Sequence, residues 1–237
     1  MTSVTATPVM LQKALQGQKL ARKPLASKKW DLEFEDVHAN TSNLSFLYLG
    51  AGTNKIVFQI AQNKTPVPWV LAFQSNETAN PDSAKTDFVD EINTLVRLGR
   101  QGVKVPAPFP NSDASASLFQ LHIDNHDSGF SGISYAFIIE YFDLKSRYLE
   151  MDKKDKDPGG FMRKCLGTPN AKNNLKQTQG CFELINAAWK REPWGDFQVL
   201  YDVDHGWLLV FDPMPKAVNK EKIDKLLAEW EGDLNKS

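Results

Sequence analysis

The sequence predicts an α+β protein with two parts, a strand-rich half followed by a helical half that contains a β-hairpin. Three short segments with alternating apolar residues lie within residues 44–74 and predict neighbouring strands. Residues 80–102 repeat apolar side chains at helical spacing, as do 177–193 and 220–231. Residues 197–213 interrupt the helical half with two apolar runs around a tight turn. Such segregation of strands and helices is typical of α+β proteins.

The composition excludes several classes of protein. The chain has 237 residues with 28 basic and 29 acidic side chains, so its formal net charge is −1. This balance indicates no nucleic-acid partner and no polybasic membrane surface. No apolar run approaches the roughly 20 residues that a membrane span needs. Two cysteines without CxxC spacing, Cys165 and Cys181, predict neither a zinc ribbon nor a disulfide scaffold.

Residues 1–40 are predicted to be a polar leader or tail. They lack the long apolar core of a cleavable signal peptide, and one short helix is expected around VMLQKALQ. A disordered tail and a non-cleaved secretion or partner-binding segment both fit this composition. After this segment, we expect a strand-rich lobe with its hinge at 41–142 and a helical lobe at 143–237.

Within the strand-rich half, one acidic residue stands out on the helix expected at 80–102. Phe88, Ile92, Leu95 and Val96 form the apolar stripe of that helix. Glu91 lies three residues after the first of them and four before the third, so it borders the buried face. Two further strands are expected at 117–123 and 133–142, before a charged connection leads to the helical half.

This order of elements resembles the protein-kinase-like fold. A glycine-containing hairpin comes first, and a third strand and a helix with an inward-leaning glutamate follow. Next come a strand that ends in an acidic–aromatic pair, a helix, and a hairpin that ends in an aspartate. The resemblance covers about residues 44–214. It implies a two-lobed, ATP- and Mg²⁺-dependent transferase whose second lobe is a truncated helical lobe containing the hairpin.

The glycine-containing hairpin carries the first part of this resemblance. Gly50 and Gly52 match the loop with which kinases cover ATP phosphates, because backbone N–H groups can approach oxygens where Cβ is absent; an ordinary hairpin is the alternative. Gln74 stands where kinases place their third-strand lysine, and it is expected among the nucleotide-binding residues although a neutral amide cannot replace the cation. Lys55 is therefore expected to bind phosphates instead, an arrangement similar to the with-no-lysine kinases, and Glu91 is expected to orient it.

The remaining site residues follow from the same resemblance. Glu140 and Phe142 correspond to the hinge, whose backbone groups bind adenine. Asp212 in VFDPM corresponds to the metal-binding aspartate, and Gln198 is expected to assist with Mg²⁺. Asp196 lies 16 residues before Asp212, and is expected to position and deprotonate the acceptor hydroxyl.

The predicted function is phosphorylation of a protein by a kinase of minimal size. Only 25 residues follow Asp212. A second lobe of this small size resembles that of the truncated kinases found among bacterial effectors and toxins. By this analogy the protein is cytoplasmic, or is secreted into a host or target cell without a cleavable signal. Two alternatives remain open: a pseudokinase that serves as a binding or scaffolding module, and a kinase-fold enzyme that transfers AMP.

A separate group of potential metal ligands lies in HIDNHD. His122 and His126 are four residues apart, a spacing that brings two imidazoles together only on a helix. Strand-like residues precede this segment, so a zinc site is a minor alternative.

Overall fold

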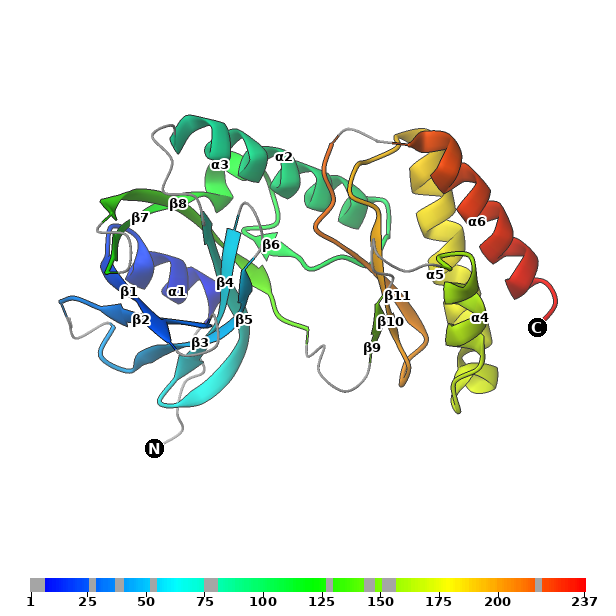
Figure 1. Ribbon diagram of the computed structural model, residues 1–237, viewed down its shortest axis with the longest axis horizontal. Coiled ribbons are helices and arrows are strands. Elements are labelled where there is room, and N and C mark those ends of the chain that lie inside the picture. Colours follow the sequence, from blue (N-terminus) through cyan, green and yellow to red (C-terminus); the bar gives the residue numbers. More distant parts are fainter. Residues whose placement is uncertain are drawn as a thin grey trace. The chain divides into compact units, whose positions relative to one another are not determined.

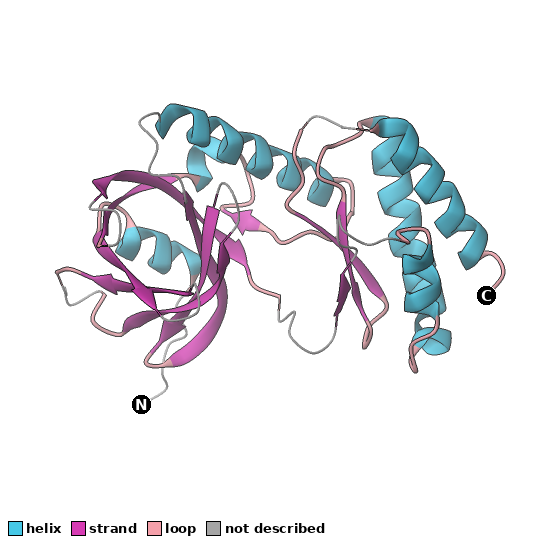
Figure 2. Cartoon of the chain, viewed as in Figure 1, coloured by secondary structure: helices cyan, strands magenta, loops and turns pink. Residues whose placement is uncertain are grey.

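A computed structural model of the chain describes residues 7–25, 29–36, 41–51, 55–74, 81–126, 130–142, 148–150, 157–215 and 219–237. The mixed α+β class is confirmed (Figures 1 and 2). The chain divides into two compact units. The first comprises Met1–Ile92 and Ala107–Tyr141, and the second comprises Asn93–Pro106 and Phe142–Ser237. Within the described residues, no helix is long and apolar enough to cross a bilayer.

A mixed sheet forms most of the first unit. Its strands lie in the order β2-β1-β7-β8-β5-β4-β3, and β6 pairs with β8. All pairs are antiparallel except β1 with β7. The strands are β1 (Lys19–Leu25), β2 (Lys29–Phe34), β3 (Leu44–Ala51), β4 (Lys55–Gln62), β5 (Thr65–Gln74), β6 (Pro108–Phe109), β7 (Phe119–Asn125) and β8 (Phe130–Glu140). The three strands expected within 44–74 and the two expected at 117–123 and 133–142 are thus confirmed, with small changes of boundary.

The sheet curls so that its first and last strands approach one another. The rings of Phe34 on β2 and Phe46 on β3 lie 5.3 Å apart. Helix α1 (Pro8–Leu15) lies against this curved sheet (Figure 1) and contributes Leu11 and Leu15 to its apolar core. Both leucines are fully buried. Burial of this stripe, rather than helix propensity, stabilises so short a helix.

The expectation of a polar tail over residues 1–40 is corrected for the described part of that range. The short helix is present as α1, but β1 and β2 follow it and join the main sheet. Their polar composition concealed them, because charged residues alternate with the few apolar ones that enter the core, Leu20 and Leu32. The structure therefore places no boundary at residue 40.

Helix α2 (Pro81–Arg100) confirms the amphipathic segment expected at 80–102, and the four residues of its predicted stripe are buried. The division between the two units falls within this helix, after Ile92. The strand-rich half was expected to contain one helix. That number is wrong, because α1 and the short α3 (Ala114–Ser117) also lie in the first unit.

The second unit combines a small antiparallel sheet with helices. Strand β10 (Gln198–Asp202) pairs with both β9 (Tyr148–Glu150) and β11 (Trp207–Phe211). Helices α4 (Gly160–Leu166), α5 (Ala171–Arg191) and α6 (Lys220–Leu234) pack on one another, and α5 also packs on β11. The predicted hairpin and last two helices are confirmed, while α4 and β9 were not predicted. A cluster of aromatic rings fills the core: Phe161, Trp189, Trp194, Phe197 and Trp230.

The turn between β10 and β11 is closed by a buried carboxylate and a glycine. Asp202 accepts hydrogen bonds from the backbone N–H groups of Asp204 and His205 and contacts the His205 ring nitrogen at 2.7 Å. Gly206 has φ +70°, and a Cβ there would lie 2.5 Å from the Cβ of Asn174. Only glycine satisfies both the left-handed backbone and this close approach. Asp202 therefore serves the turn.

Candidate functional site

Lys55 and Glu91 form an ion pair in the first unit. Lys55 is the first residue of β4, and Glu91 lies in α2. The Lys55 Nζ and Glu91 Oε1 atoms are 2.5 Å apart, and the side chains are 20% and 5% exposed. A buried carboxylate needs a charged or hydrogen-bonding partner, and Lys55 supplies it. The structure therefore brings together the two residues that the sequence pattern paired across 36 positions.

Gln74 lies next to this pair. It ends β5 and is the cross-strand partner of Lys55. Its side chain is buried, and its Oε1 accepts a hydrogen bond from the backbone N–H of Tyr135 at 3.0 Å. The carboxamide is thus fixed by β8. No sequence pattern pointed to Tyr135, because only the pairing of β5 with β8 brings it near Gln74.

The glycine-containing loop joins β3 to β4. Gly50 lies in β3 at an irregularity of the pairing with β4 that follows Tyr48. A Cβ at Gly50 would meet no atom within 4 Å. Among the described residues, open space therefore surrounds the position that a Cβ of residue 50 would occupy. Gly52 lies outside the described residues.

Glu140 and Phe142 are the two residues expected at the hinge. The first lies at the end of β8, and the second lies just after it. Glu140 is the last residue of β8, and its backbone N–H donates to the Ala107 carbonyl at 3.0 Å. Its carboxylate accepts from the Ala107 N–H at 3.4 Å. A ligand contact from the Glu140 backbone would therefore use the carbonyl oxygen. Phe142 belongs to the second unit, where the Lys104 ammonium lies 5.9 Å from its ring centre.

Asp196 and Asp212 share an unusual backbone geometry in the second unit. Their φ angles are +52° and +51°. Other non-glycine residues with positive φ among those described, Asn63, Lys64 and Asn219, lie in the β4–β5 turn or precede α6. The two aspartates instead flank the open end of the β10–β11 hairpin. Strained backbone of this kind is concentrated at functional sites.

The pairing at this end of the hairpin places the two aspartates in one short segment. Gln198 pairs with Phe211, and an isolated bridge joins Gly195 to Met214. Asp196 and Asp212 both lie between these two pairings, and both are partly buried. The structure thus gathers Asp196, Gln198 and Asp212 at one end of one hairpin, although 16 positions separate the first from the last.

Oxygen ligands of this kind fit Mg²⁺, which usually takes one or two carboxylates and completes its shell with water and substrate phosphates. Asp212 and the amide oxygen of Gln198 would hold the ion. In the parts of the chain that the structure describes, no three acidic, histidine or cysteine side chains gather into a metal cluster. His122 lies in β7 rather than on a helix, so the spacing required for a zinc site with His126 is not met.

A second group of charged residues lies in the first unit, where β1 is paired with β7. Lys19 contacts Glu35 at 2.6 Å and Asp124 at 3.0 Å. The side-chain contact with Glu35 lowers the pKa of Asp124, and the contacts with Ser131 and Lys19 lower it further. The same contacts, with Glu35 and then Asp124, raise the pKa of Lys19. Both effects stabilise the ionised forms.

No protein-family model matches the sequence, and no curated protein matches it either.

Proposed function

We propose that the protein is an ATP- and Mg²⁺-dependent phosphotransferase of minimal, two-lobed kinase-like fold that phosphorylates a protein. The observation that carries the proposal is the Lys55–Glu91 ion pair. A lysine in the strand after a glycine-containing loop is held by a buried glutamate of a helix, while the neighbouring strand carries glutamine at the matching position. This combination resembles a kinase whose phosphate-binding lysine has moved into the glycine loop.

The first unit would bind the nucleotide. The Lys55 ammonium would contact the phosphates as a point charge, and Glu91 would hold it in position. Backbone N–H groups around Gly50 and Gly52 would add contacts to the phosphate oxygens. The carbonyl of Glu140 and the backbone of Phe142 would bind adenine. Gln74, a neutral side chain already bonded to Tyr135, would take no phosphate.

The second unit would supply the metal ligands and the acceptor site. Bound Mg²⁺ neutralises charge on the phosphates. Asp212 and Gln198 would ligate the ion, and Asp196 would hold the acceptor hydroxyl and take its proton. The left-handed backbone of both aspartates restricts the direction in which each side chain leaves the main chain. Catalysis of this type depends mainly on positioning and charge neutralisation.

A charge-relocation experiment tests this assignment. Transfer of the γ-phosphate of ATP to proteins of a lysate is measured for the wild type, Lys55→Gln and Lys55→Gln/Gln74→Lys. Since residues 55 and 74 are cross-strand partners, a lysine at 74 lies within reach of the same glutamate. We expect Lys55→Gln to lose transfer and the double variant to regain part of it. Wild-type activity in Lys55→Gln would contradict the proposal.

A pseudokinase is the second candidate, and Gln74 favours it. A neutral amide at this position removes the usual phosphate contact, and the hydrogen bond to Tyr135 stabilises the glutamine where it is. A pseudokinase would bind ATP without transferring phosphate. Transfer of AMP is a third outcome, and it is recognised by labelling from the α-phosphate. A role as an effector or toxin delivered to another cell remains part of the proposal, by resemblance.

A further inference from the structure

The turn between β10 and β11 in the second unit presents a histidine whose ring is held by two neighbours. The Nδ1 atom of His205 lies 2.7 Å from Oδ2 of Asp202. The same ring stacks on Trp207, with the ring centres 4.4 Å apart and the planes inclined by 14°. The His205 side chain is nevertheless 50% exposed, whereas that of Asp202 is 3% exposed. The ring is therefore both oriented and accessible.

The contact with Asp202 determines which ring nitrogen of His205 carries the proton. The other oxygen of this carboxylate accepts the backbone N–H groups of Asp204 and His205. An ionised carboxylate can only accept hydrogen bonds, so the Nδ1 of the ring is the donor. In the neutral ring the lone pair then lies on Nε2, which has no hydrogen-bonding partner within the described ranges. Closing the turn thus uses Nδ1 and leaves Nε2 available as a nucleophile.

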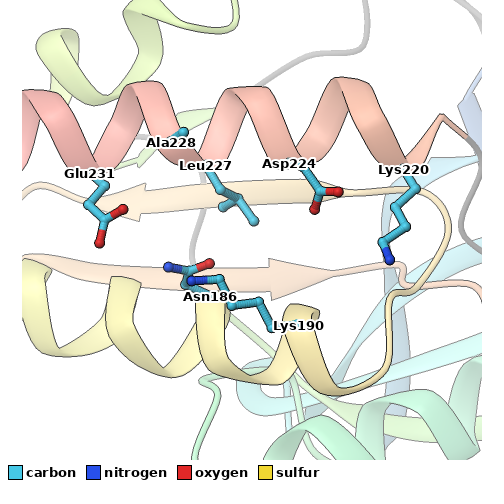
Figure 3. Close-up of a pocket in the computed structure, with 7 residues that line it drawn as sticks. All are labelled: Asn186, Lys190, Lys220, Asp224, Leu227, Ala228 and Glu231. Atoms are coloured by element: carbon cyan, nitrogen blue, oxygen red, sulfur yellow. The ribbon is translucent and has the colours of Figure 1, made fainter.

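The groove that α5 and α6 line in the same unit offers no comparable group. Figure 3 shows the Lys190 ammonium beside Asn186, and Asp224 next to Lys220. These polar side chains therefore have polar neighbours inside the groove. A lysine ammonium also carries donors only and holds no lone pair. Between these two features of the second unit, the nucleophile is His205.

We propose that His205 is a phosphorylation site whose Nε2 accepts the γ-phosphate of ATP. This inference rests on the proposed phosphotransferase function, which supplies the donor. Nε2 attacks the γ-phosphorus, an N–P bond forms, and the P–O bond to ADP breaks, so that ADP leaves with the electron pair. Nε2 holds no proton, so the step needs no base. Positive charge develops on the ring, and the Asp202 carboxylate stabilises it through the Nδ1–H.

The donor ATP is expected to be bound by another copy of the chain. His205 lies in the turn of the β10–β11 hairpin, whereas Asp196 and Asp212 lie at its open end. The five residues of β10 span about 17 Å at roughly 3.4 Å per residue. This distance separates His205 from the proposed metal site of its own chain. The rate of labelling per chain should therefore rise in proportion to the protein concentration.

Complementation between two full-length variants tests this inference. His205→Gln keeps the proposed catalytic residues but lacks the acceptor nitrogen, and Asp212→Asn keeps the acceptor but should not transfer phosphate. Each is incubated with Mg²⁺ and ATP labelled at the γ-phosphate, alone and mixed, with a tag that separates the two chains on a gel. We expect label on the Asp212→Asn chain in the mixture and on neither chain alone. His205→Gln should still label lysate proteins.

The chemistry of the label identifies the residue. A phosphate on a histidine nitrogen is stable in alkali and is lost in mild acid, whereas a phosphate ester of serine or threonine is stable in acid. The wild type should carry acid-labile label, and His205→Gln should lose it. His126→Gln, which alters an exposed histidine of the first unit, is the control and should be labelled as the wild type is.

A small phosphate donor tests the nitrogen without any enzyme activity. Phosphoramidate transfers its phosphoryl group to a neutral imidazole nitrogen and releases ammonia. Mass spectrometry of peptides measures the rate of modification at each histidine. We expect faster modification at His205 than at His126, because the proton of His205 is held on Nδ1 by Asp202.

Three results would overturn the inference, and they separate it from the proposed function. If lysate proteins are labelled but the Asp212→Asn chain carries no acid-labile label in the mixture, His205 is not a phosphorylation site and the phosphotransferase proposal stands. If the wild type labels neither itself nor the lysate, both proposals are contradicted, whatever the reactivity toward phosphoramidate. If phosphoramidate modifies His205 no faster than His126, the assignment of Nε2 as an available nucleophile is wrong.

Discussion

The polar residues of the two units are fixed in different ways. In the first unit, Lys55 is positioned by another side chain, since the buried Glu91 holds its ammonium at 2.5 Å. In the second unit, Asp196 and Asp212 share left-handed φ angles at the open end of a hairpin, so the main chain itself restricts where each carboxylate lies. A site held by side chains loses stability when one partner is removed. Where the backbone restricts the position of a residue, substitution by a residue of the same shape and conformational preference should keep the stability. Only the catalytic activity should then be lost.

The largest effect is expected from isosteric changes in the second unit. Asp212→Asn and Asp196→Asn should each reduce phosphate transfer at least about 100-fold, because one loses a metal-binding charge and the other a proton acceptor. Asparagine accepts the left-handed backbone, so the free energy of unfolding should change by less than about 1 kcal/mol. Transfer assays and urea unfolding measure both quantities.

Asp204→Asn is the control for these two variants. It alters an exposed aspartate in the turn at the other end of the same hairpin. Transfer at the wild-type rate is expected. An equal loss of activity in Asp204→Asn would show that any charge change near the hairpin disturbs the unit, and the roles of Asp196 and Asp212 would not hold.

In the first unit, activity and stability should fall together. Lys55→Met leaves Glu91 buried without its cation, so we expect transfer to be lost and the free energy of unfolding to fall by about 3 kcal/mol. The double variant Lys55→Met/Glu91→Leu removes both charges. It should regain most of the stability but none of the activity, a separation that chemical denaturation and transfer assays detect. Recovery of activity in the double variant would contradict the role of Lys55.

A sequence predicts such a site when each of its residues lies in an element that local periodicity reveals. The strands around Gly50 and the stripe of α2 were predictable from periodicity, and the order of these elements then led to Lys55 and Glu91. The pairing of β1 and β2 with the sheet was not predictable. Their few core residues alternate with charges, and the contact of β1 with β7 spans about 100 positions.

The hairpin of the second unit was predictable from its apolar runs. Asp196 and Asp212, at its open end, were the predicted catalytic and metal-binding residues. Their shared backbone conformation was not foreseeable, because aspartate adopts right-handed or left-handed backbone and the surrounding fold decides between them. The groove that residues of α5 and α6 line was also not predicted. Asn186 is one polar residue in an amphipathic helix, and its burial depends on how α6 packs against α5.

A smaller effect is expected at Gly50. The open space around it means that Gly50→Ala should leave the melting temperature unchanged. If backbone N–H groups of this loop contact phosphate, the added methyl group hinders the approach, and ATP affinity should fall about 10-fold. Isothermal titration of ATP measures this change. Unchanged affinity would identify the loop as an ordinary hairpin connection.

The smallest effect is expected at Lys19, which also contacts carboxylates in the first unit. Since Glu35, Ser131 and Lys19 lower the pKa of Asp124, this carboxylate stabilises the fold above its unfolded pKa of about 3.9 and loses that contribution as the pH falls below it. Lys19→Met removes one of the three groups, so the pKa of Asp124 should rise. Carboxyl NMR titration measures it. Lys23→Met, at the exposed contact with Glu33, is the control and should leave Asp124 unchanged.

The most direct test of the central claim is incubation of the purified protein with Mg²⁺, a lysate and ATP labelled at either the α- or the γ-phosphate. The account predicts protein labelling from the γ-position alone, and its loss in Lys55→Gln and Asp212→Asn. Labelling from the α-position would indicate AMP transfer, and ATP binding without labelling would indicate a pseudokinase. If ATP causes no labelling and no shift of the melting temperature, the account is contradicted entirely. Lys55 and Glu91 would then form a structural ion pair.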